Sequence, residues 1–176
     1  AYSKAIQWKK QQEQRNSNAD VIWEFAGPLN IGGRISDIEI PIDQALTYYV
    51  GAASGGIFKT TDGGANWIPI FDDQEMLSIG DMEISKNNTD LIWVGTGEVN
   101  AGGGSLAYDG NGIYKSDDAG TTWEAKGLPA TGSIGKVLID PNDDETIFVG
   151  AMGPLFRNDD NRGVYRSTND GDDWEQ

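Results

Sequence analysis

The chain has 176 residues, of which 28 are Asp or Glu and 13 are Lys or Arg, so its formal net charge is −15. This charge repels phosphate backbones and argues against nucleic acid as a partner, and no apolar run approaches the roughly 20 residues that span a bilayer as a helix. The sequence contains no Cys and no His, which excludes disulfides, thiolate metal sites and histidine-based catalysis.

The first 20 residues predict a helical leader. Residues 3–16 are polar, rich in helix formers, and begin at Ser3, which suits a helix N-cap. Ile6 and Trp8 give this segment a weak apolar face only. We therefore expect residues 1–20 to form a surface helix ahead of the main domain, with docking onto a partner as the alternative role.

Residues 21–26 predict an outer strand that is displaced from its own sheet. The sequence Trp23–Leu29 is similar to Trp123–Pro129, which begins the last strand of a repeat unit later in the chain. We therefore expect residues 21–26 to complete a sheet whose other strands lie elsewhere.

Similar segments then repeat through the rest of the chain. Each contains the pattern Ser/Thr-x-Asp/Asn-x-Gly-x-x-Trp, and the tryptophans Trp67, Trp123 and Trp174 are 56 and 51 residues apart. Upstream of each pattern lie a run that begins with Ile (strand A), an aromatic-Val-Gly run (strand B) and a run led by Gly (strand C), and strand D starts at the Trp. The expected strands A, B and C are 35–40, 48–51 and 56–59, then 79–84, 92–95 and 112–115, then 134–139, 147–150 and 163–166.

These units predict an all-β fold, a β-propeller of four-stranded antiparallel blades. The partial propeller covers residues 21–176, with blade 1 at 33–71, blade 2 at 78–126 and an incomplete blade 3 at 133–176. Propellers have about four to eight blades, so we expect an incomplete fragment of about three. The remaining blades would come from missing chain or from a partner protein.

The repeated pattern resembles the turn known as an Asp box. Its Asp and Ser/Thr oxygens can accept backbone hydrogen bonds, its Gly relieves a backbone strain, and its Trp anchors strand D. A feature that recurs in every blade is not a single active site, so we predict a structural role in place of a catalytic or metal-binding one. The box residues are Thr60, Asp62, Gly64, Trp67, Ser116, Asp118, Gly120, Trp123, Ser167, Asn169, Gly171 and Trp174.

The acidic run Asp140–Asp144 offers hard oxygen ligands of the kind that Ca²⁺ prefers. It lacks the glycine-spaced order of an EF-hand loop. We predict a solvated turn and no metal or cofactor, with Ca²⁺ as the alternative.

The loops between strands B and C vary in length, and variable loops on a rigid scaffold are where binding sites concentrate. The longest, residues 98–111, combines a carboxylate, an amide and an aromatic ring among glycines, which suits a sugar or a peptide; contact with the missing blades is the alternative. The candidate binding residues are Arg34, Glu98, Asn100, Tyr108 and Asp109. For Arg34, the alternative to a ligand carboxylate is an ion pair with Asp37 or Asp81.

The boxes, the stretch Trp23–Ile35 and the segment Gly51–Lys59 resemble the Asp-box propellers, also called bacterial neuraminidase repeats. The resemblance is closest to secreted bacterial sortilin-like repeat proteins. It implies a secreted or cell-surface module, without catalysis, that binds protein or glycan through its variable loops.

The same family includes sialidases and xyloglucan-active hydrolases, which implies a glycoside hydrolase as the alternative. Sialidases resemble one another in three substrate-gripping arginines, but here only Arg34 stands at a suitable strand start. Xyloglucan-active relatives use two facing carboxylates, and Ala52–Gly56 has no acid where one is expected. Glu98 is the remaining catalytic candidate, and its partner acid would lie in the missing blades.

Overall fold

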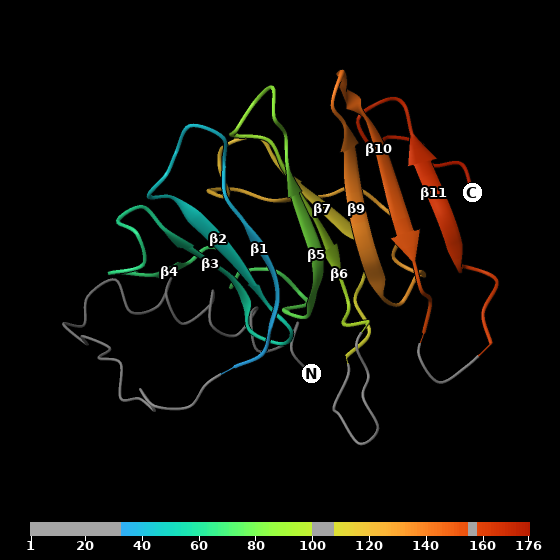
Figure 1. The fold of residues 1–176 in the computed structure, drawn as a ribbon. Helices are drawn as coiled ribbons and strands as arrows, with labels where there is room; N and C mark the ends of the chain where they lie inside the picture. The colour runs from blue at the N-terminus through green and yellow to red at the C-terminus, as the bar shows by residue number, and fades with distance from the viewer. Residues whose placement is uncertain (1–32, 100–107, 155–157) are drawn as a thin grey trace, which may run out of the picture. The chain divides into compact units, whose positions relative to one another are not determined.

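The computed structural model describes residues 33–99, 108–154 and 158–176. Within these ranges all regular structure is β-strand, and the strands form antiparallel sheets in one compact unit, Arg34–Gln176 (Figure 1). No helix capable of crossing a bilayer occurs in these described ranges. The predictions for residues 1–20 and 21–26, and the candidate residue Asn100, lie outside the described residues.

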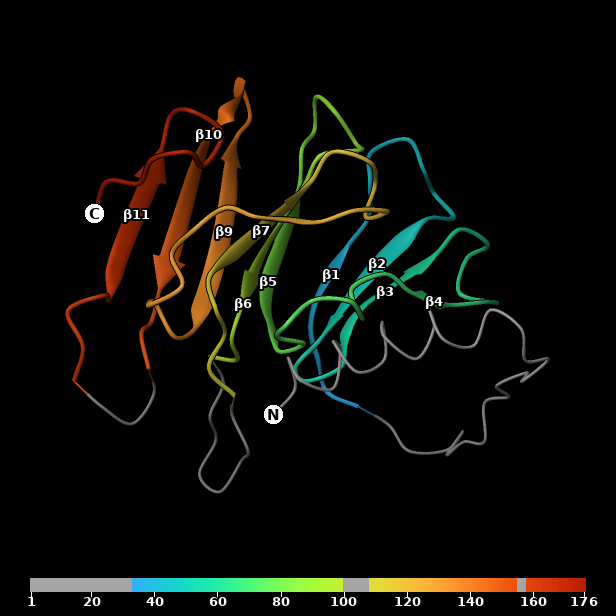
Figure 2. The same ribbon diagram turned by 180° about the vertical axis from the view of Figure 1, so that it is seen from behind.

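Each sheet is a meander whose strands lie side by side in chain order (Figures 1 and 2). We call the sheets blades 1, 2 and 3. Blade 1 contains β1 (Ile35–Glu39), β2 (Tyr48–Ala52), β3 (Gly56–Thr60) and β4 (Ile68–Pro69). Blade 2 contains β5 (Ile79–Ile84), β6 (Ile92–Thr96), β7 (Ile113–Ser116) and β8 (Glu124–Ala125). Blade 3 contains β9 (Ile134–Asp140), β10 (Asp143–Ala151) and β11 (Gly163–Ser167), and an isolated bridge between Arg166 and Glu175 stands in for its fourth strand.

The expected strands are present, with two differences in their bounds. The outermost strands are short and begin one residue after the box tryptophan, at Ile68 and Glu124. In blade 3 the run Asp140–Asp144, expected to be a solvated turn, is partly strand, because β10 begins at Asp143 and pairs this residue with Asp140 of β9.

The blades pack face to face through two hydrophobic cores. We call the first strand of each blade (β1, β5 and β9) its inner strand, and β5 contacts both β1 and β9. The first core joins Tyr49, Ile57 and Phe71 of the blade 1 segment to the blade 2 residues Met82 and Val94. The second core lies between blades 2 and 3 and includes Trp93, Ile113, Ile134, Val137 and Val149. Each internal face is therefore buried by the next blade along the chain.

The glycine of the aromatic-Val-Gly run makes this close packing possible. A Cβ added at Gly51 would lie 2.8 Å from Cγ2 of Ile79, and one added at Gly95 would lie 2.3 Å from Cγ2 of Ile134. The first isoleucine of each inner strand thus occupies the space that a side chain at the preceding blade's glycine would fill.

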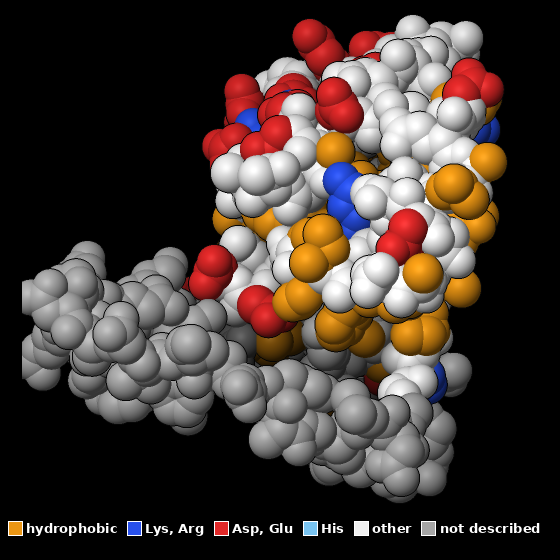
Figure 3. Space-filling model, turned by 90° about the vertical axis from the view of Figure 1, so that its left-hand side faces the viewer, with side chains coloured by type: hydrophobic (Ala, Val, Ile, Leu, Met, Phe, Trp, Pro, Cys, Tyr) orange, Lys and Arg blue, Asp and Glu red, His pale blue; other side chains and the backbone are white. Residues whose placement is uncertain are grey.

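Among the described residues, no blade covers the outward side of blade 1. Figure 3 shows this side of the molecule, with hydrophobic side chains gathered on its surface. Ile35, Ile38, Ile40 and Trp67 of blade 1 are exposed, whereas their matching residues in blades 2 and 3 pack in or against the two cores.

Candidate functional site

The candidate binding residues stand where inner strands begin and where strand B leads to strand C. Arg34 immediately precedes β1, Glu98 follows β6, and Tyr108 and Asp109 precede β7. The N–H of Glu98 donates a hydrogen bond to the carbonyl of Tyr108 at 3.1 Å, so the two ends of the long loop lie together. The structure therefore brings four of the five candidates to one side of the blades.

Arg34 and Glu98 form an ion pair between Nη2 and Oε2. The side chain of Glu98 is only 5% exposed, and its backbone carbonyl accepts a hydrogen bond from Ser133 Oγ at 3.1 Å. Asp37 and Asp81, the partners considered for Arg34 from the sequence, accept backbone N–H groups of Met82 and Val137 at 2.7 and 2.8 Å. Arg34 and Glu98 thus balance each other's charge, whereas Tyr108 and Asp109 stay exposed.

The box turns share one set of hydrogen bonds. In the first, Gly64 N–H donates to Thr60 Oγ1 at 3.0 Å, Thr60 Oγ1 donates to Asp62 at 2.8 Å, and Asn66 donates to Asp62 from both its backbone and its side chain. In the second, Ser116, Asp118 and Thr122 make the equivalent contacts. Hydrogen bonds to the charged form lower the pKa of Asp62 to about 2, with the Asn66 N–H the largest cause, and they also lower the pKa of Asp118.

The third box turn keeps these contacts with the polar groups exchanged. Asn169 Oδ1 accepts the Asp173 N–H at 3.0 Å, while the Asn169 side-chain amide donates to the Asp173 carboxylate at 3.1 Å. The amide and the carboxylate therefore occupy each other's positions compared with Asp62 and Asn66. Sequence reasoning noted Asn169 but missed Asp173, although an acid at the position of Asn66 was the available signal.

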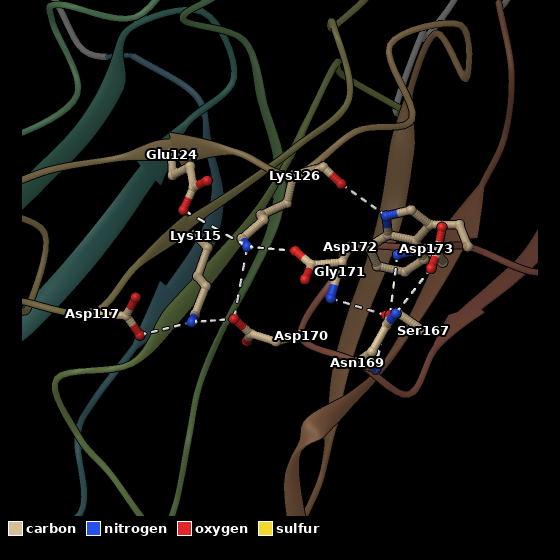
Figure 4. Close-up of polar contacts among 11 residues, drawn as sticks. Lys115, Asp117, Glu124, Lys126, Ser167, Asn169, Asp170, Gly171, Asp172 and Asp173 are labelled. Carbon is tan, nitrogen blue, oxygen red and sulfur yellow. Dashed lines mark hydrogen bonds and ion pairs between the residues drawn. The ribbon is translucent and has the colours of Figure 1, made fainter.

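The third box turn is also joined to blade 2 by charge, as Figure 4 shows. Lys115 Nζ lies 2.6 Å from Asp170 Oδ2, and Lys126 Nζ lies 3.2 Å from Asp172 Oδ1. Burial is the largest single influence on the pKa of both lysines and lowers it, but the surrounding carboxylates together outweigh burial, so both pKa values are raised. In the first interface the matching Lys59 donates to the carbonyl of Ala119 at 3.0 Å. The cation of strand C therefore reaches the fourth residue of the next box in both interfaces.

Acidic side chains gather along the inner strands. Burial is the main reason why the pKa of Glu39 rises to about 7, and the nearby carboxylates of Asp37 and Glu83 raise it further. Burial also raises the pKa of Asp81 and of Glu83. Lys136 Nζ lies 2.9 Å from Asp81 Oδ2 and partly offsets the negative charge of this group.

The run Asp140–Asp144 makes turn and interface contacts. Asp140 accepts the N–H of Asn142 at 2.9 Å, Asp143 accepts the hydroxyl of Thr146 at 2.7 Å, and Asp144 accepts Ser85 Oγ of blade 2 at 2.6 Å. No group of three or more acidic or other ligating side chains is arranged to hold a metal ion in the part of the chain that the structure describes.

Comparisons with known proteins identify the architecture. No protein-family model matches the chain, and neither does any curated protein. Among solved structures, an ancestral GH74 enzyme matches with a TM-score of 0.61 and 19% identity over 84% of this chain and 19% of that one. The GH74 xyloglucanase from Xanthomonas campestris matches with a TM-score of 0.58 and 18% identity over 82% and 21% of the two chains.

A third similar structure is YCF48 bound to D1 peptide, with a TM-score of 0.54 and 15% identity over 81% of this chain and 39% of that one. The chain thus spans from 19% to 39% of the length of these three proteins. Together with the three stacked antiparallel sheets, these matches show that the chain has the fold of part of a β-propeller.

Proposed function

We propose that the chain is a non-catalytic module of a secreted or cell-surface propeller protein of the Asp-box type, which binds protein or glycan through its loops between strands B and C. The observation that carries this proposal is the Arg34–Glu98 ion pair, which engages the one catalytic candidate and leaves Tyr108 and Asp109 exposed beside it.

A basic protein segment is the ligand that the charge of the module favours. The net charge of −15 attracts cations over distance, Asp109 offers an exposed carboxylate, and Tyr108 offers an aromatic face for a Lys or Arg side chain. The D1 peptide bound by YCF48 supports a peptide as ligand for this fold.

Binding of the full chain to arrays of basic peptides and of glycans tests the proposal. Tyr108→Ala and Asp109→Asn should each weaken binding by at least about tenfold, as expected for central contact residues. Glu145→Gln, an exposed acid-to-amide change near the start of β10 and away from these loops, is the matched control and should bind normally. Binding that is unchanged in both loop variants would overturn the proposal.

The alternative is glycoside hydrolysis, which the similarity to GH74 enzymes favours. A glycosidase carboxylate must reach the sugar, whereas the carboxylate of Glu98 is only 5% exposed and is held by the guanidinium of Arg34. Polysaccharides including xyloglucan should therefore not be cleaved. If they are cleaved, Glu98→Gln and Arg34→Gln distinguish a catalytic role of the Glu98 carboxylate from a structural role of the ion pair. Both variants break the ion pair, but only Glu98→Gln removes the carboxylate.

A further inference from the structure

Three kinds of contact recur at both blade interfaces and define what the outer face of blade 1 can bind. This face includes Ile35, Ile38, Ile40 and Trp67, whose matching residues in blades 2 and 3 pack in or against the two cores between blades. The inference below rests on the proposed function in one respect, namely that the module belongs to a larger propeller.

The first contact is made by the isoleucine that begins each inner strand. Ile79 and Ile134 are 0% exposed, because each packs where Gly51 or Gly95 of the preceding blade leaves room. Ile35 holds the matching position in blade 1 and is 46% exposed. Burying it requires a preceding blade with a glycine opposite.

The second contact joins the inner strands through a carboxylate. Asp37 Oδ2 accepts the N–H of Met82 at 2.7 Å, and Asp81 Oδ2 accepts the N–H of Val137 at 2.8 Å. In blade 1 the matching N–H belongs to Ile38, which donates at 2.9 Å to Asp37 of its own strand and is 58% exposed. A preceding blade with Asp at the third position of its inner strand would accept this N–H.

The third contact is made by the box tryptophan. Trp123 Nε1 donates to the carbonyl of Ile70 at 2.7 Å, and Trp174 Nε1 donates to the carbonyl of Lys126 at 2.8 Å. Trp67, the matching residue of blade 1, is exposed. Its indole N–H is placed to donate to the outermost strand of a preceding blade.

We propose that the outer face of blade 1 binds a further β-blade that carries Asp at the third position of its inner strand and a carbonyl opposite Trp67. The side chain of Ile35, the N–H of Ile38 and the indole N–H of Trp67 then acquire the partners that their counterparts have inside the chain.

A second copy of this chain is the nearest competitor, since no blade within the described ranges covers the outer face of blade 3 either. A Cβ at Gly150 would meet only Lys136 atoms, the nearest at 3.6 Å, so this face has room for an isoleucine such as Ile35. The third residue of β9 is Lys136, however, whose ammonium lies 2.9 Å from Asp81 Oδ2 of blade 2, so this position offers no acceptor to the N–H of Ile38. A copy of this chain therefore fails at the inner strand, where the proposed blade succeeds.

Sedimentation velocity of the full chain over a concentration series tests this requirement for a carboxylate. Lys136→Asp gives blade 3 the missing acceptor and should allow head-to-tail association at least about tenfold tighter than Lys136→Ala, the gain expected from one charge-assisted hydrogen bond. Ile35→Asp in the Lys136→Asp background should abolish the association, because it removes the apolar contact on the face of blade 1.

Lys136→Asn provides a neutral acceptor if the additional acid beside Asp81 prevents folding, which circular dichroism would show. Equal association of the acceptor variants and Lys136→Ala would overturn the proposal. So would tight head-to-tail association of the unmodified chain that Ile35→Asp disrupts, because the occupant would then be a second copy. Neither result depends on ligand binding by Tyr108 and Asp109, so failure of the proposed function would be seen separately.

Discussion

The third box turn shows that the same hydrogen bonds form whether the carboxylate precedes the amide in sequence or follows it. Asp62 and Asn66 stand in the first turn, and Asn169 and Asp173 stand in the third. Each turn holds one donor opposite one acceptor. The turn requires one donor opposite one acceptor, and either position can supply the donor.

This complementarity predicts a non-additive pair of substitutions. Asn169→Asp places two carboxylates together in place of a hydrogen bond and should lower the free energy of unfolding by about 1 kcal/mol at neutral pH. Adding Asp173→Asn recreates the order of the first turn and should restore most of the loss. Urea denaturation of the two single variants and the double variant measures the coupling, and purely additive losses would contradict the pairing.

Glu39 predicts a pH dependence of stability. Its pKa is raised from 4.5 to about 7 mainly by burial, so the folded chain binds the proton more tightly than the unfolded chain. This raised pKa makes the free energy of unfolding fall as pH rises from 4.5 towards 7. Glu39→Gln removes the cost and should stabilise the chain by about 1 kcal/mol above this window, once solvent screening is allowed for.

Thermal unfolding of Glu39→Gln across the acid-to-neutral range measures this effect. The difference from the unmodified chain should vanish below the unfolded pKa of Glu and be fully developed above the folded one. Glu145→Gln, at an exposed position near the start of β10, serves as the control. A gain from Glu39→Gln that is independent of pH would contradict the assigned cause.

At the scale of the elements, the strands form where repeated short β-prone runs alternate with turns, and the interfaces add the contacts that hold them. The indole of Trp123 illustrates this, since it bonds to Ile70 of blade 1 and packs edge-on against Phe71, with ring centroids 5.1 Å apart. Trp67 has the same place in the repeat but no preceding blade in the described chain.

Trp123→Phe should lower the free energy of unfolding by about 1–2 kcal/mol, because the carbonyl of Ile70 loses its donor. Trp67→Phe is the matched control and should change stability by less than about 0.5 kcal/mol, as is usual for an exposed side chain. Chemical denaturation of both variants makes the comparison. Equal losses would show that the tryptophans act within their own blades, not between blades.

The strands were predictable because each repeat carries its own pattern of isoleucine, aromatic and glycine residues. The pairing of Arg34 with Glu98 was not, because the two residues belong to different blades. An irregular register between Ile35 and Asp37 leaves Asp37 bonded to Met82 of the next blade. Spacing within one repeat does not reveal such a bond, since it depends on how two blades face each other.

The contacts of Lys115 were missed for the same reason. Its partner Asp170 lies 55 residues later and belongs to another blade. In sequence the two charges stand in unrelated parts of the repeat, a strand and a box turn. Only the packing of blade 3 on blade 2 brings them together.

At the scale of the whole molecule, the described chain has two closed blade interfaces between two open outer faces. Val164 on the far face of blade 3 is 65% exposed, whereas the matching Ile57 is 0% exposed and is covered by blade 2. The similarity to longer propeller proteins and this contrast between matching residues lead to one central claim. The module is a segment of a propeller whose outer faces are interfaces for further blades.

Amide hydrogen exchange of the isolated chain, followed residue by residue by NMR, tests that claim most directly. The N–H groups of Ile38, Met82 and Val137 hold matching positions, but only the last two are bonded to a preceding blade. Met82 and Val137 should exchange much more slowly than Ile38. Protection of Ile38 equal to that of Met82 would contradict the claim, because the face of blade 1 would then already be covered.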